Sequence, residues 1–133
     1  MSHENVDLFL RVADAINARE VPDALIAPDF HIENIVTAVS DKTYHGAAGA
    51  REWLSDTFDA FAEGARYEVE EIVADGDDFV VARIALVGSG ARSGAPLQLR
   101  FVTAAWYSDG KAMRAASYAN RHEAFKAVGL ESV

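Results

Sequence analysis

From residue 67 onward the hydrophobic residues recur with a period of two, and this change of period constrains the fold more than any other feature. Four runs carry the pattern, and they cover Tyr67–Ala74, Phe79–Val87, Leu97–Tyr107 and Lys111–Asn120. A period of two is typical of β-strands, in which successive side chains point to opposite faces. Short turns such as Ser108-Asp109-Gly110 separate the runs. The second half of the chain therefore predicts four long strands in hairpin succession.

The first half has the helical period instead. Its predicted elements are a helix over Ser2–Arg19, a short helix over Pro22–Ala27, a strand over Phe30–Val36, a polar loop over Ser40–Gly46 and a helix over Ala47–Glu63. A final helix is predicted over Arg121–Val128. Helices that precede a run of antiparallel strands indicate the α+β class. The length of 133 residues suits one domain over residues 1–133.

The strands over Phe79–Val87 and Leu97–Tyr107 are apolar on both faces. A sheet that is covered by helices on one side only is expected to be polar on the other side. We therefore expect a cover on the second face as well. We expect odd-numbered residues of the late strands to face the helices and even-numbered residues to face outward.

The charge of the chain excludes several partners. Asp and Glu outnumber Lys and Arg by 21 to 12, which gives a net charge of −9. Such a chain repels phosphate backbones and anionic membranes, so we expect neither nucleic acid nor membrane as a partner. The chain has no cysteine, and its first residues, MSHENVDLF, lack the basic and apolar segments of a signal peptide. A cytoplasmic protein is expected.

Five short stretches, taken in order and with their spacing, resemble the nuclear transport factor 2-like superfamily, and within it the SnoaL-like branch that handles small molecules. They are Ile16-Asn17-Ala18-Arg19-Glu20, Ala27-Pro28-Asp29-Phe30, Tyr44-His45-Gly46, Ser108-Asp109-Gly110-Lys111 and Tyr118-Ala119-Asn120-Arg121. The resemblance implies a curved antiparallel sheet wrapped around helices, a cone-like half-barrel with a central pocket, and a homodimer. It implies no single activity, because isomerases, cyclases, dehydratases, epoxide hydrolases and inert binding proteins share the fold.

The catalytic residues of ketosteroid-isomerase-like relatives do not carry over. The positions that correspond to the proton shuttle and the two oxyanion donors hold Asn34, Val12 and, approximately, Thr103. An amide does not remove a proton from carbon near neutral pH, and valine donates no hydrogen bond.

Polyketide-cyclase-like relatives place an acid in the pocket. Here the residues of the last strand that are expected to face inward are Met113, Ala115, Ser117 and Ala119. None of these four side chains is a carboxylate, so the acid of those relatives does not carry over either.

The pattern of limonene-epoxide-hydrolase-like relatives is also incomplete. Asn34 and Arg83 match it, but the two acids are replaced by Ala85 and Ser117 and the tyrosine by Ile32. Because the missing acids are the proton carriers, hydrolysis of an epoxide by that mechanism is not expected.

The remaining pocket is chiefly apolar with a few polar groups, as small-molecule sites usually are. Its expected lining is Val12, Ile16, Phe30, Ile32, Asn34, Trp53, Leu54, Phe58, Arg83, Leu99, Phe101, Thr103, Met113 and Ser117. We expect Arg83 to be largely buried, either bound to an anionic group of a ligand or paired with Glu71 or Glu70.

Other candidate residues also have two interpretations. Asn34 either orients a ligand or bonds to backbone at a strand end, and Trp53 either contacts a ligand or is simply part of the core. His31, His45 and His122 lack the spacing of metal ligands, so no metal is expected. No motif predicts a cofactor.

Two hypotheses of function follow. The first is the binding of a small, largely apolar metabolite, with at most one anionic group, without catalysis. The alternative is an isomerase, cyclase or hydratase acting on a ring-shaped metabolite with Arg83, Asn34 and a carboxylate such as Glu71, which a bulge at Glu70-Glu71 would turn inward. A protein-interaction domain is a third class, which no motif supports.

The even-numbered residues of the late strands predict a homodimer. They form an apolar outer face that includes Ile84, Val102, Trp106 and Tyr118, with Trp106 as the central anchor. A monomer rarely exposes so large an apolar surface, and no remaining segment of the chain looks long enough to cover it. A second copy of the chain is the expected cover.

Overall fold

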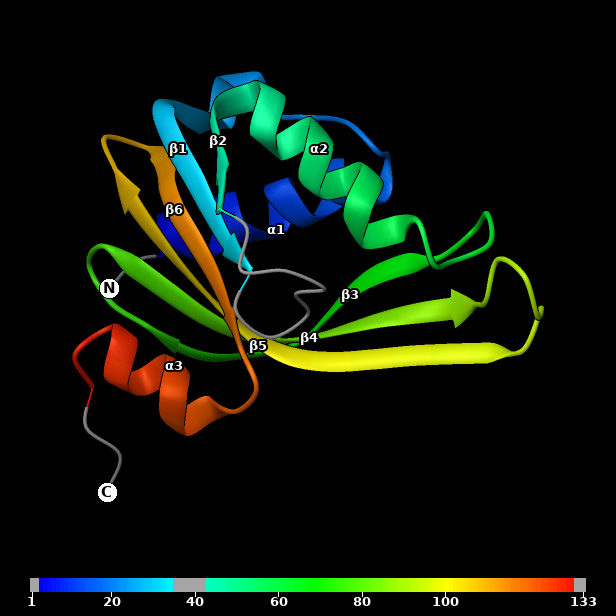
Figure 1. Ribbon diagram of the computed structural model, residues 1–133. Helices are drawn as coiled ribbons and strands as arrows, with labels where there is room; N and C mark the ends of the chain where they lie inside the picture. The colour runs from blue at the N-terminus through cyan, green and yellow to red at the C-terminus, as the bar shows by residue number, and fades with distance from the viewer. Residues whose placement is uncertain (1–2, 35–42, 131–133) are drawn as a thin grey trace.

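The computed structural model describes residues 3–34 and 43–130, which form helices packed against one curved sheet (Figure 1). The helices are α1 (His3–Asn17), α2 (Gly46–Phe58) and α3 (Arg121–Ala127), with a 3₁₀ turn at Asp23–Leu25. The strands are β1 (Ile26–Asn34), β2 (Thr43–His45), β3 (Arg66–Asp75), β4 (Phe79–Ser89), β5 (Pro96–Ser108) and β6 (Lys111–Tyr118). They are ordered β2-β1-β6-β5-β4-β3, so the sheet stays open between β2 and β3. The predicted α+β half-barrel is confirmed, and one pair, β1 with β6, is parallel.

The two faces of the sheet carry different layers. Helices α1 and α2 lie on one side and α3 on the other (Figure 1). We call the side of α1 and α2 the inner face. It holds the larger hydrophobic core, to which β4 contributes Val80, Ala82, Ile84 and Leu86. The outer face has a smaller cluster, centred on Val81, Val102, Ala104, Ala116 and Tyr118 under α3.

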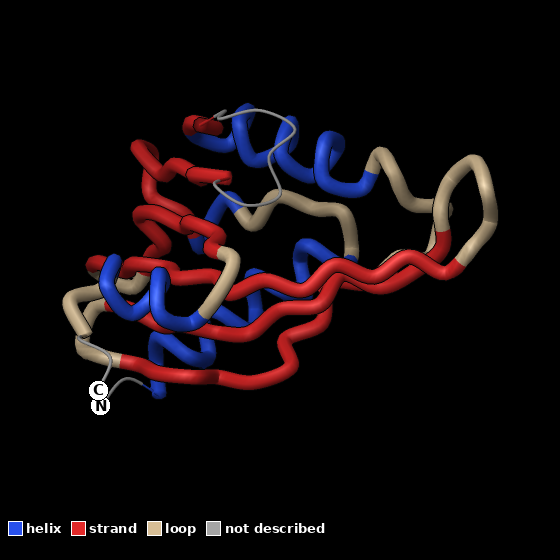
Figure 2. The backbone as a smooth tube through the Cα atoms, turned by 60° about the horizontal axis from the view of Figure 1, so that its bottom comes forward, coloured by secondary structure: helices blue, strands red, loops and turns tan. Residues whose placement is uncertain are grey.

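The β4–β5 hairpin extends beyond the helices, and the segment after α2 lies beside it (Figure 2). Helix α2 ends at Phe58, five residues before the predicted end at Glu63. The backbone after the helix bonds to the hairpin instead: the Ala62 amide donates to the Ser89 carbonyl at 2.7 Å, and Phe61 forms a bridge with Gly90. These long-range bonds replace the last helical turn that the apolar spacing predicts.

The first strand begins earlier than expected. The predicted helix over Pro22–Ala27 is only the 3₁₀ turn at Asp23–Leu25, and β1 starts at Ile26. Pro28 is tolerated because the pairing of β1 with β6 is irregular between Ile26 and His31, where no ladder hydrogen bond is required of the proline.

The predicted polar loop over Ser40–Gly46 contains a strand. Residues 43–45 form β2, which pairs with β1 and brings Tyr44 next to α2, where its hydroxyl donates to Asp56 at 2.9 Å. Residues 40–42, and residues 35 and 36 of the predicted first strand, lie outside the described residues.

The expectation that odd-numbered residues face inward on every late strand is wrong for β4. The ladder pairs an odd-numbered residue of β4 with an even-numbered residue of β5, as in Arg83 with Val102. Paired residues of an antiparallel ladder share a face. Odd positions therefore face inward on β5, as predicted, but outward on β4. Ile84 consequently lies on the inner face, fully buried, and Arg83 lies on the outer face.

The last helix covers part of the outer face. Ala124 of α3 is fully buried against the outer cluster, and Phe125 packs beside it. Asn120 starts the helix, because its side-chain oxygen accepts a hydrogen bond from the Glu123 amide at 3.0 Å. The chain thus supplies some of the cover that the sequence assigned to a second copy.

Candidate functional site

A cavity lies between the inner face of the sheet and helices α1 and α2. Its volume is about 80 Å³, and it is partly open to solvent. Its lining is Phe9, Val12, Ala13, Ile16, Glu20, Val21, Pro22, Ile26, Phe30, Ile32, Ala50, Trp53, Leu54, Tyr67, Thr103, Ala105, Tyr107, Ala112, Ala115 and Ser117. Small-molecule sites commonly have this largely apolar character.

Eight residues of the predicted lining do lie around this cavity. They are Val12, Ile16, Phe30, Ile32, Trp53, Leu54, Thr103 and Ser117. They come from α1, β1, α2, β5 and β6, and each follows from the apolar stripe of its helix or from the strand register. Phe101 is buried in the same core but does not line the cavity.

Three other predicted lining residues lie elsewhere. Phe58, the last residue of α2, borders surface grooves, where the Arg19 guanidinium lies 3.6 Å from the centre of its ring. Leu99 is 43% exposed, because it belongs to the part of β5 beyond the helices. Met113 is half-buried at a break in the β5–β6 ladder, where the register shifts after Trp106 and the alternation is lost.

Asn34 is the last residue of β1. Its backbone lies opposite Ser117 of β6 in the parallel ladder, and Ser117 lines the cavity. Both interpretations of Asn34 stay predictions.

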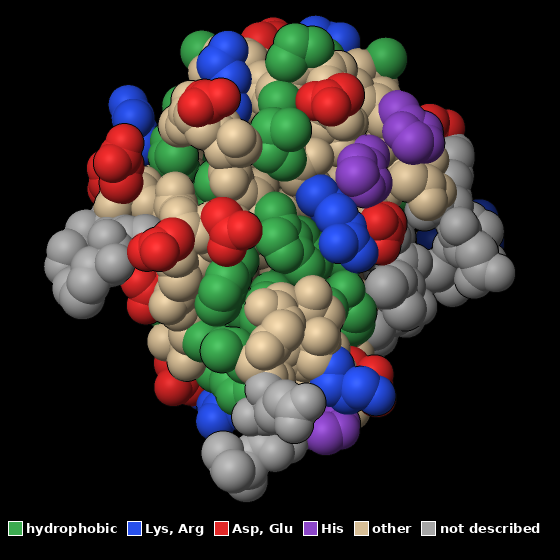
Figure 3. Space-filling model, turned by 90° about the vertical axis from the view of Figure 1, so that its left-hand side faces the viewer, with side chains coloured by type: hydrophobic (Ala, Val, Ile, Leu, Met, Phe, Trp, Pro, Cys, Tyr) green, Lys and Arg blue, Asp and Glu red, His purple; other side chains and the backbone are tan. Residues whose placement is uncertain are grey.

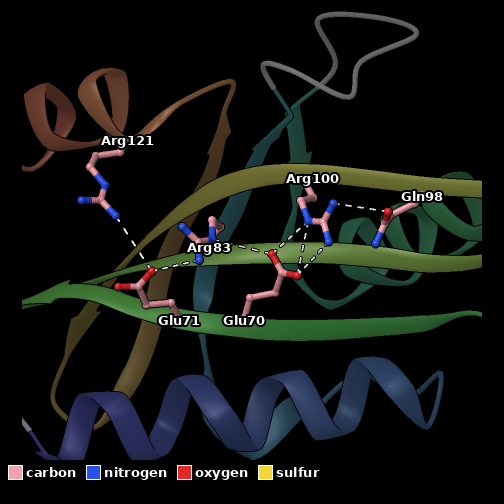
Figure 4. Close-up of polar contacts among 6 residues, drawn as sticks. All are labelled: Glu70, Glu71, Arg83, Gln98, Arg100 and Arg121. Atoms are coloured by element: carbon pink, nitrogen blue, oxygen red, sulfur yellow. Dashed lines mark hydrogen bonds and ion pairs between the residues drawn. The ribbon is translucent and has the colours of Figure 1, made fainter.

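Arg83 does not line the cavity, and the prediction that it is largely buried is wrong. Its side chain is 46% exposed on the outer face, away from α1 (Figure 4). There its Nη2 lies 3.1 Å from Glu71 Oε1 and its Nε lies 3.6 Å from Glu70 Oε1. The ion pair with Glu71, one of the two predicted alternatives, is therefore present, but in a partly solvated position.

The predicted bulge at Glu70-Glu71 is also present, but it does not turn a carboxylate inward. The β3–β4 register shifts between Val69 and Glu71, so the consecutive residues Glu70 and Glu71 both lie on the outer face. Glu70 reaches Arg100, with Oε1 3.2 Å from its Nε, while Glu71 pairs with Arg83 and lies 3.9 Å from Arg121 (Figure 4). Glu71 is thus part of a surface ion-pair network.

Apart from Glu20, the polar side chains of the cavity wall are neutral, and most of them carry hydroxyl groups. The Thr103 hydroxyl lies 3.4 Å from that of Ser117, and Tyr67 of β3 also lines the cavity. Burial raises the pKa of the Tyr67 and Tyr107 hydroxyls far above the ordinary value for tyrosine. Both groups therefore keep their protons near neutral pH and act as hydrogen-bond donors, not as anions.

Tyr67 and Tyr107 were not predicted as pocket residues. Tyr67 opens the predicted strand Tyr67–Ala74 and alternates with Val69, which packs against the same core. That alternation is the available signal for Tyr67. Tyr107 lies at the end of its strand on the odd-numbered side, which the sequence correctly assigned as inward for β5.

Trp53 of α2 has the most informative position. Its ring meets Tyr67 edge-on, with the ring centres 6.4 Å apart, and the residue is 8% exposed. Its Nε1 is buried without a hydrogen-bond partner in the described part of the chain. Because a buried N–H without a partner costs about 1–3 kcal/mol, such a group in a cavity wall is a natural donor to a ligand.

The family model of the SnoaL-like domain matches residues 9–115, which include α1 from Phe9 onward, the whole cavity wall contributed by β1, α2, β3 and β5, and part of β6. This chain belongs to the SnoaL-like domain family. Solved structures similar to this SnoaL-like domain include TerC co-crystallised with polyporic acid, at 23% identity and a TM-score of 0.71, with 92% of this chain and 98% of that chain covered.

Two further structures extend the comparison. IdmH from Streptomyces antibioticus, proposed to be a polyketide cyclase, is 20% identical with a TM-score of 0.73 and covers 96% of this chain and 100% of its own. A protein with a ketosteroid isomerase-like fold from Catenulispora acidiphila, solved with trimethylamine, is 16% identical with a TM-score of 0.69 and 92% coverage of both chains. At these identities the likeness establishes the shared fold. A comparison with curated proteins finds no match.

The described residues of this SnoaL-like domain gather no group of three or more histidine or acidic side chains that fits a metal ion. Among the helices in residues 3–34 and 43–130, none has the length and apolar character needed to cross a membrane.

Proposed function

We propose that this SnoaL-like domain binds a small, largely apolar metabolite inside the cavity and holds a hydrogen-bond-accepting group of that metabolite near Trp53 and Tyr67. The observation that carries the proposal is the buried Trp53 Nε1, which has no hydrogen-bond partner among the described residues and belongs to a largely apolar wall. The structure of TerC with polyporic acid supports the proposal, since a protein of the same fold has been co-crystallised with a small molecule.

The neutral donors favour a carbonyl or hydroxyl oxygen as the accepting group. Tyr67 lies edge-on to Trp53 and keeps its proton near neutral pH. Two donors on one stretch of wall hold a single oxygen more firmly than one donor, while the apolar remainder buries the ligand's carbon skeleton.

Replacing Trp53 by phenylalanine separates this role from a purely structural one. The variant Trp53→Phe removes the N–H group but keeps an aromatic ring in the cavity wall. We expect affinity for a neutral aromatic ketone, 2-acetonaphthone, to fall roughly three- to tenfold by isothermal titration calorimetry, because one hydrogen bond is lost. Removal of the unpaired donor partly offsets the larger cavity that the smaller ring leaves, so the free variant should lose little stability.

The matched control is Trp106→Phe, which changes the other tryptophan of the chain, on the outer face. It should leave the affinity for 2-acetonaphthone unchanged. Equal losses of affinity in both variants would contradict the role of Trp53 Nε1. Native mass spectrometry of protein purified without added ligand provides an independent measurement, because apolar cavities often retain a guest.

The alternative function, an isomerase, cyclase or hydratase based on Arg83, Asn34 and Glu71, lacks support from the positions of two of these residues. Arg83 and Glu71 pair with each other on the outer face, across the sheet from the cavity. Neither is placed to touch a molecule that the cavity holds. Non-catalytic binding is therefore the function that the cavity favours.

We also propose a cytoplasmic homodimer that forms through the outer face. Ile84 leaves the predicted interface because it is buried on the inner face, but Val102, Trp106 and Tyr118 remain in the outer cluster. The Arg114 guanidinium lies 4.1 Å from the Trp106 ring centre, and interfaces often concentrate their energy in such Trp and Arg pairs. On one side of the molecule, hydrophobic side chains reach the surface between charged groups (Figure 3). Sedimentation as a monomer at micromolar concentration would contradict the proposal.

A further inference from the structure

The charge at the cavity is opposite to the one that the sequence predicts. Arg83, the expected cation, faces outward, and Glu20 is the only charged residue among the described residues that line the cavity. We infer that Glu20 makes the cavity selective for ligands whose polar end is cationic or neutral, and against ligands that carry a carboxylate there. This inference rests on the proposed function and names the class of ligand that the cavity accepts.

The backbone before Glu20 holds it in place. Arg19 has a φ of 60°, a left-handed conformation that is uncommon for a residue with a side chain. The Arg19 amide donates to Ile16 and the Glu20 amide to Ala15, at 3.0 Å and 2.9 Å, so the turn closes the end of α1. The chain reverses at this point, and Glu20, Val21 and Pro22 form one side of the cavity.

The positive charge of Arg19 does not offset Glu20, because it is turned toward a different part of the surface. Its Nη2 donates to the Ala65 carbonyl at 2.6 Å and its Nη1 donates to the Ile16 carbonyl at 3.1 Å. The guanidinium lies over the ring of Phe58, and Arg19 borders the surface grooves beside α2 but does not line the cavity. Residues 19 and 20 thus present opposite charges to two different sites.

The other polar groups of the cavity wall strengthen the preference. Tyr67 and Tyr107 are held neutral by burial, and the described lining residues include no anion besides Glu20 and no cation that would compensate a ligand carboxylate. The net charge of −9 adds a long-range repulsion of anions. Because Glu20 is exposed at the rim of the cavity, its effect is expected to be a modest factor in affinity and not an absolute barrier.

Three naphthalene derivatives of similar shape test the inference. They are 2-acetonaphthone, which is neutral, 2-naphthylmethylamine, which is cationic at pH 7, and 2-naphthoate, which is anionic. With the wild-type protein, we expect calorimetry to show the amine binding roughly three- to fivefold more tightly than the naphthoate. In Glu20→Gln this ratio should fall toward one, because the charge that distinguishes the amine from the naphthoate is removed.

A matched control keeps the change of net charge and moves it away from the cavity. Glu63 is exposed and borders a surface groove beside Phe61, so Glu63→Gln removes one negative charge without touching the cavity wall. This variant should keep the wild-type ratio between amine and naphthoate. If it loses that ratio as Glu20→Gln does, the preference comes from overall charge and the role of Glu20 is refuted.

The outcomes separate this inference from the proposed function. Failure of the wild-type protein to bind 2-acetonaphthone overturns the proposed binding function and the selectivity with it. Binding of 2-acetonaphthone together with naphthoate that binds as tightly as the amine leaves the proposed function in place and overturns the selectivity alone.

Discussion

The two faces of β4 show how differently neighbouring residues are used. Ile84 is fully buried on the inner face, in the core beneath the helices, whereas Arg83 is half exposed on the outer face among ion pairs. The polar groups that the inner face of the sheet contributes to the cavity are neutral hydroxyls. On the outer face they are charged, paired with each other and partly solvated (Figure 4).

The difference indicates that the inner face contributes more to stability than the outer face does. Burial of apolar side chains stabilises in proportion to the area removed from water, while exposed ion pairs contribute little. A substitution on the inner face should therefore cost several times more stability than one on the outer face. The three predictions that follow test this contrast, from the largest effect to the smallest.

Ile84→Ala should produce the largest loss. The residue has no exposed surface and belongs to the main core, so the substitution leaves a cavity that the sheet cannot fill. We expect the free energy of unfolding in urea to fall by about 2–5 kcal/mol. Ile84→Val, which removes one methyl group, should cost about 0.5–1.5 kcal/mol. A loss below 1 kcal/mol for the alanine variant would place Ile84 on the outer face.

The elements of the fold could be predicted because their signals are local. The helical stripe that contains Trp53 and Leu54 identified α2 and its buried side, and the four period-two runs identified β3 to β6 within one or two residues. The missed features depend on distant partners. Strand β2 has only three residues and is held by β1, and the end of α2 is set by bonds to the β4–β5 hairpin.

The site was predictable where the strand register was. Odd-numbered residues of β5 face inward as predicted, and this alternation placed Thr103 correctly in the cavity wall. The inward side of β4 depends on which β5 residue pairs with Arg83, and composition cannot show this because both faces of β4 are apolar. Glu20 was missed because it lies in a connection whose direction is set by the left-handed turn at Arg19.

Glu33→Gln should have an intermediate effect that depends on pH. Glu33 accepts two hydrogen bonds from Arg114, at 2.9 Å each, and these bonds hold the pKa of its carboxyl below the usual value. A lowered folded-state pKa stabilises the protein above the unfolded pKa, and this stability is lost as the pH falls through the folded-state pKa. The wild type should therefore be more stable than Glu33→Gln near neutral pH, by about 1 kcal/mol or less because the pair is partly exposed.

Urea unfolding at a series of pH values checks this dependence. The difference in free energy of unfolding between the wild type and Glu33→Gln should be constant near neutral pH and should shrink below about pH 4.5, the usual pKa of glutamate. Arg114→Met should show the same pH dependence, because it removes the other half of the pair. A difference that grows as the pH falls would contradict the assignment.

Arg83→Met should produce the smallest loss, although the residue lies next to Ile84. Its ion pair with Glu71 has both side chains nearly half exposed, so water already solvates the charges and little is gained from pairing them. The methionine keeps the apolar stem of the arginine against the sheet. We expect the free energy of unfolding to change by no more than about 1 kcal/mol. A double-mutant cycle with Glu71→Gln isolates the pair, and its coupling should also stay within about 1 kcal/mol. A loss of about 3 kcal/mol, the value typical of breaking a buried pair, would mean that Arg83 is enclosed in solution, by a second copy of the chain or by a movement of α3.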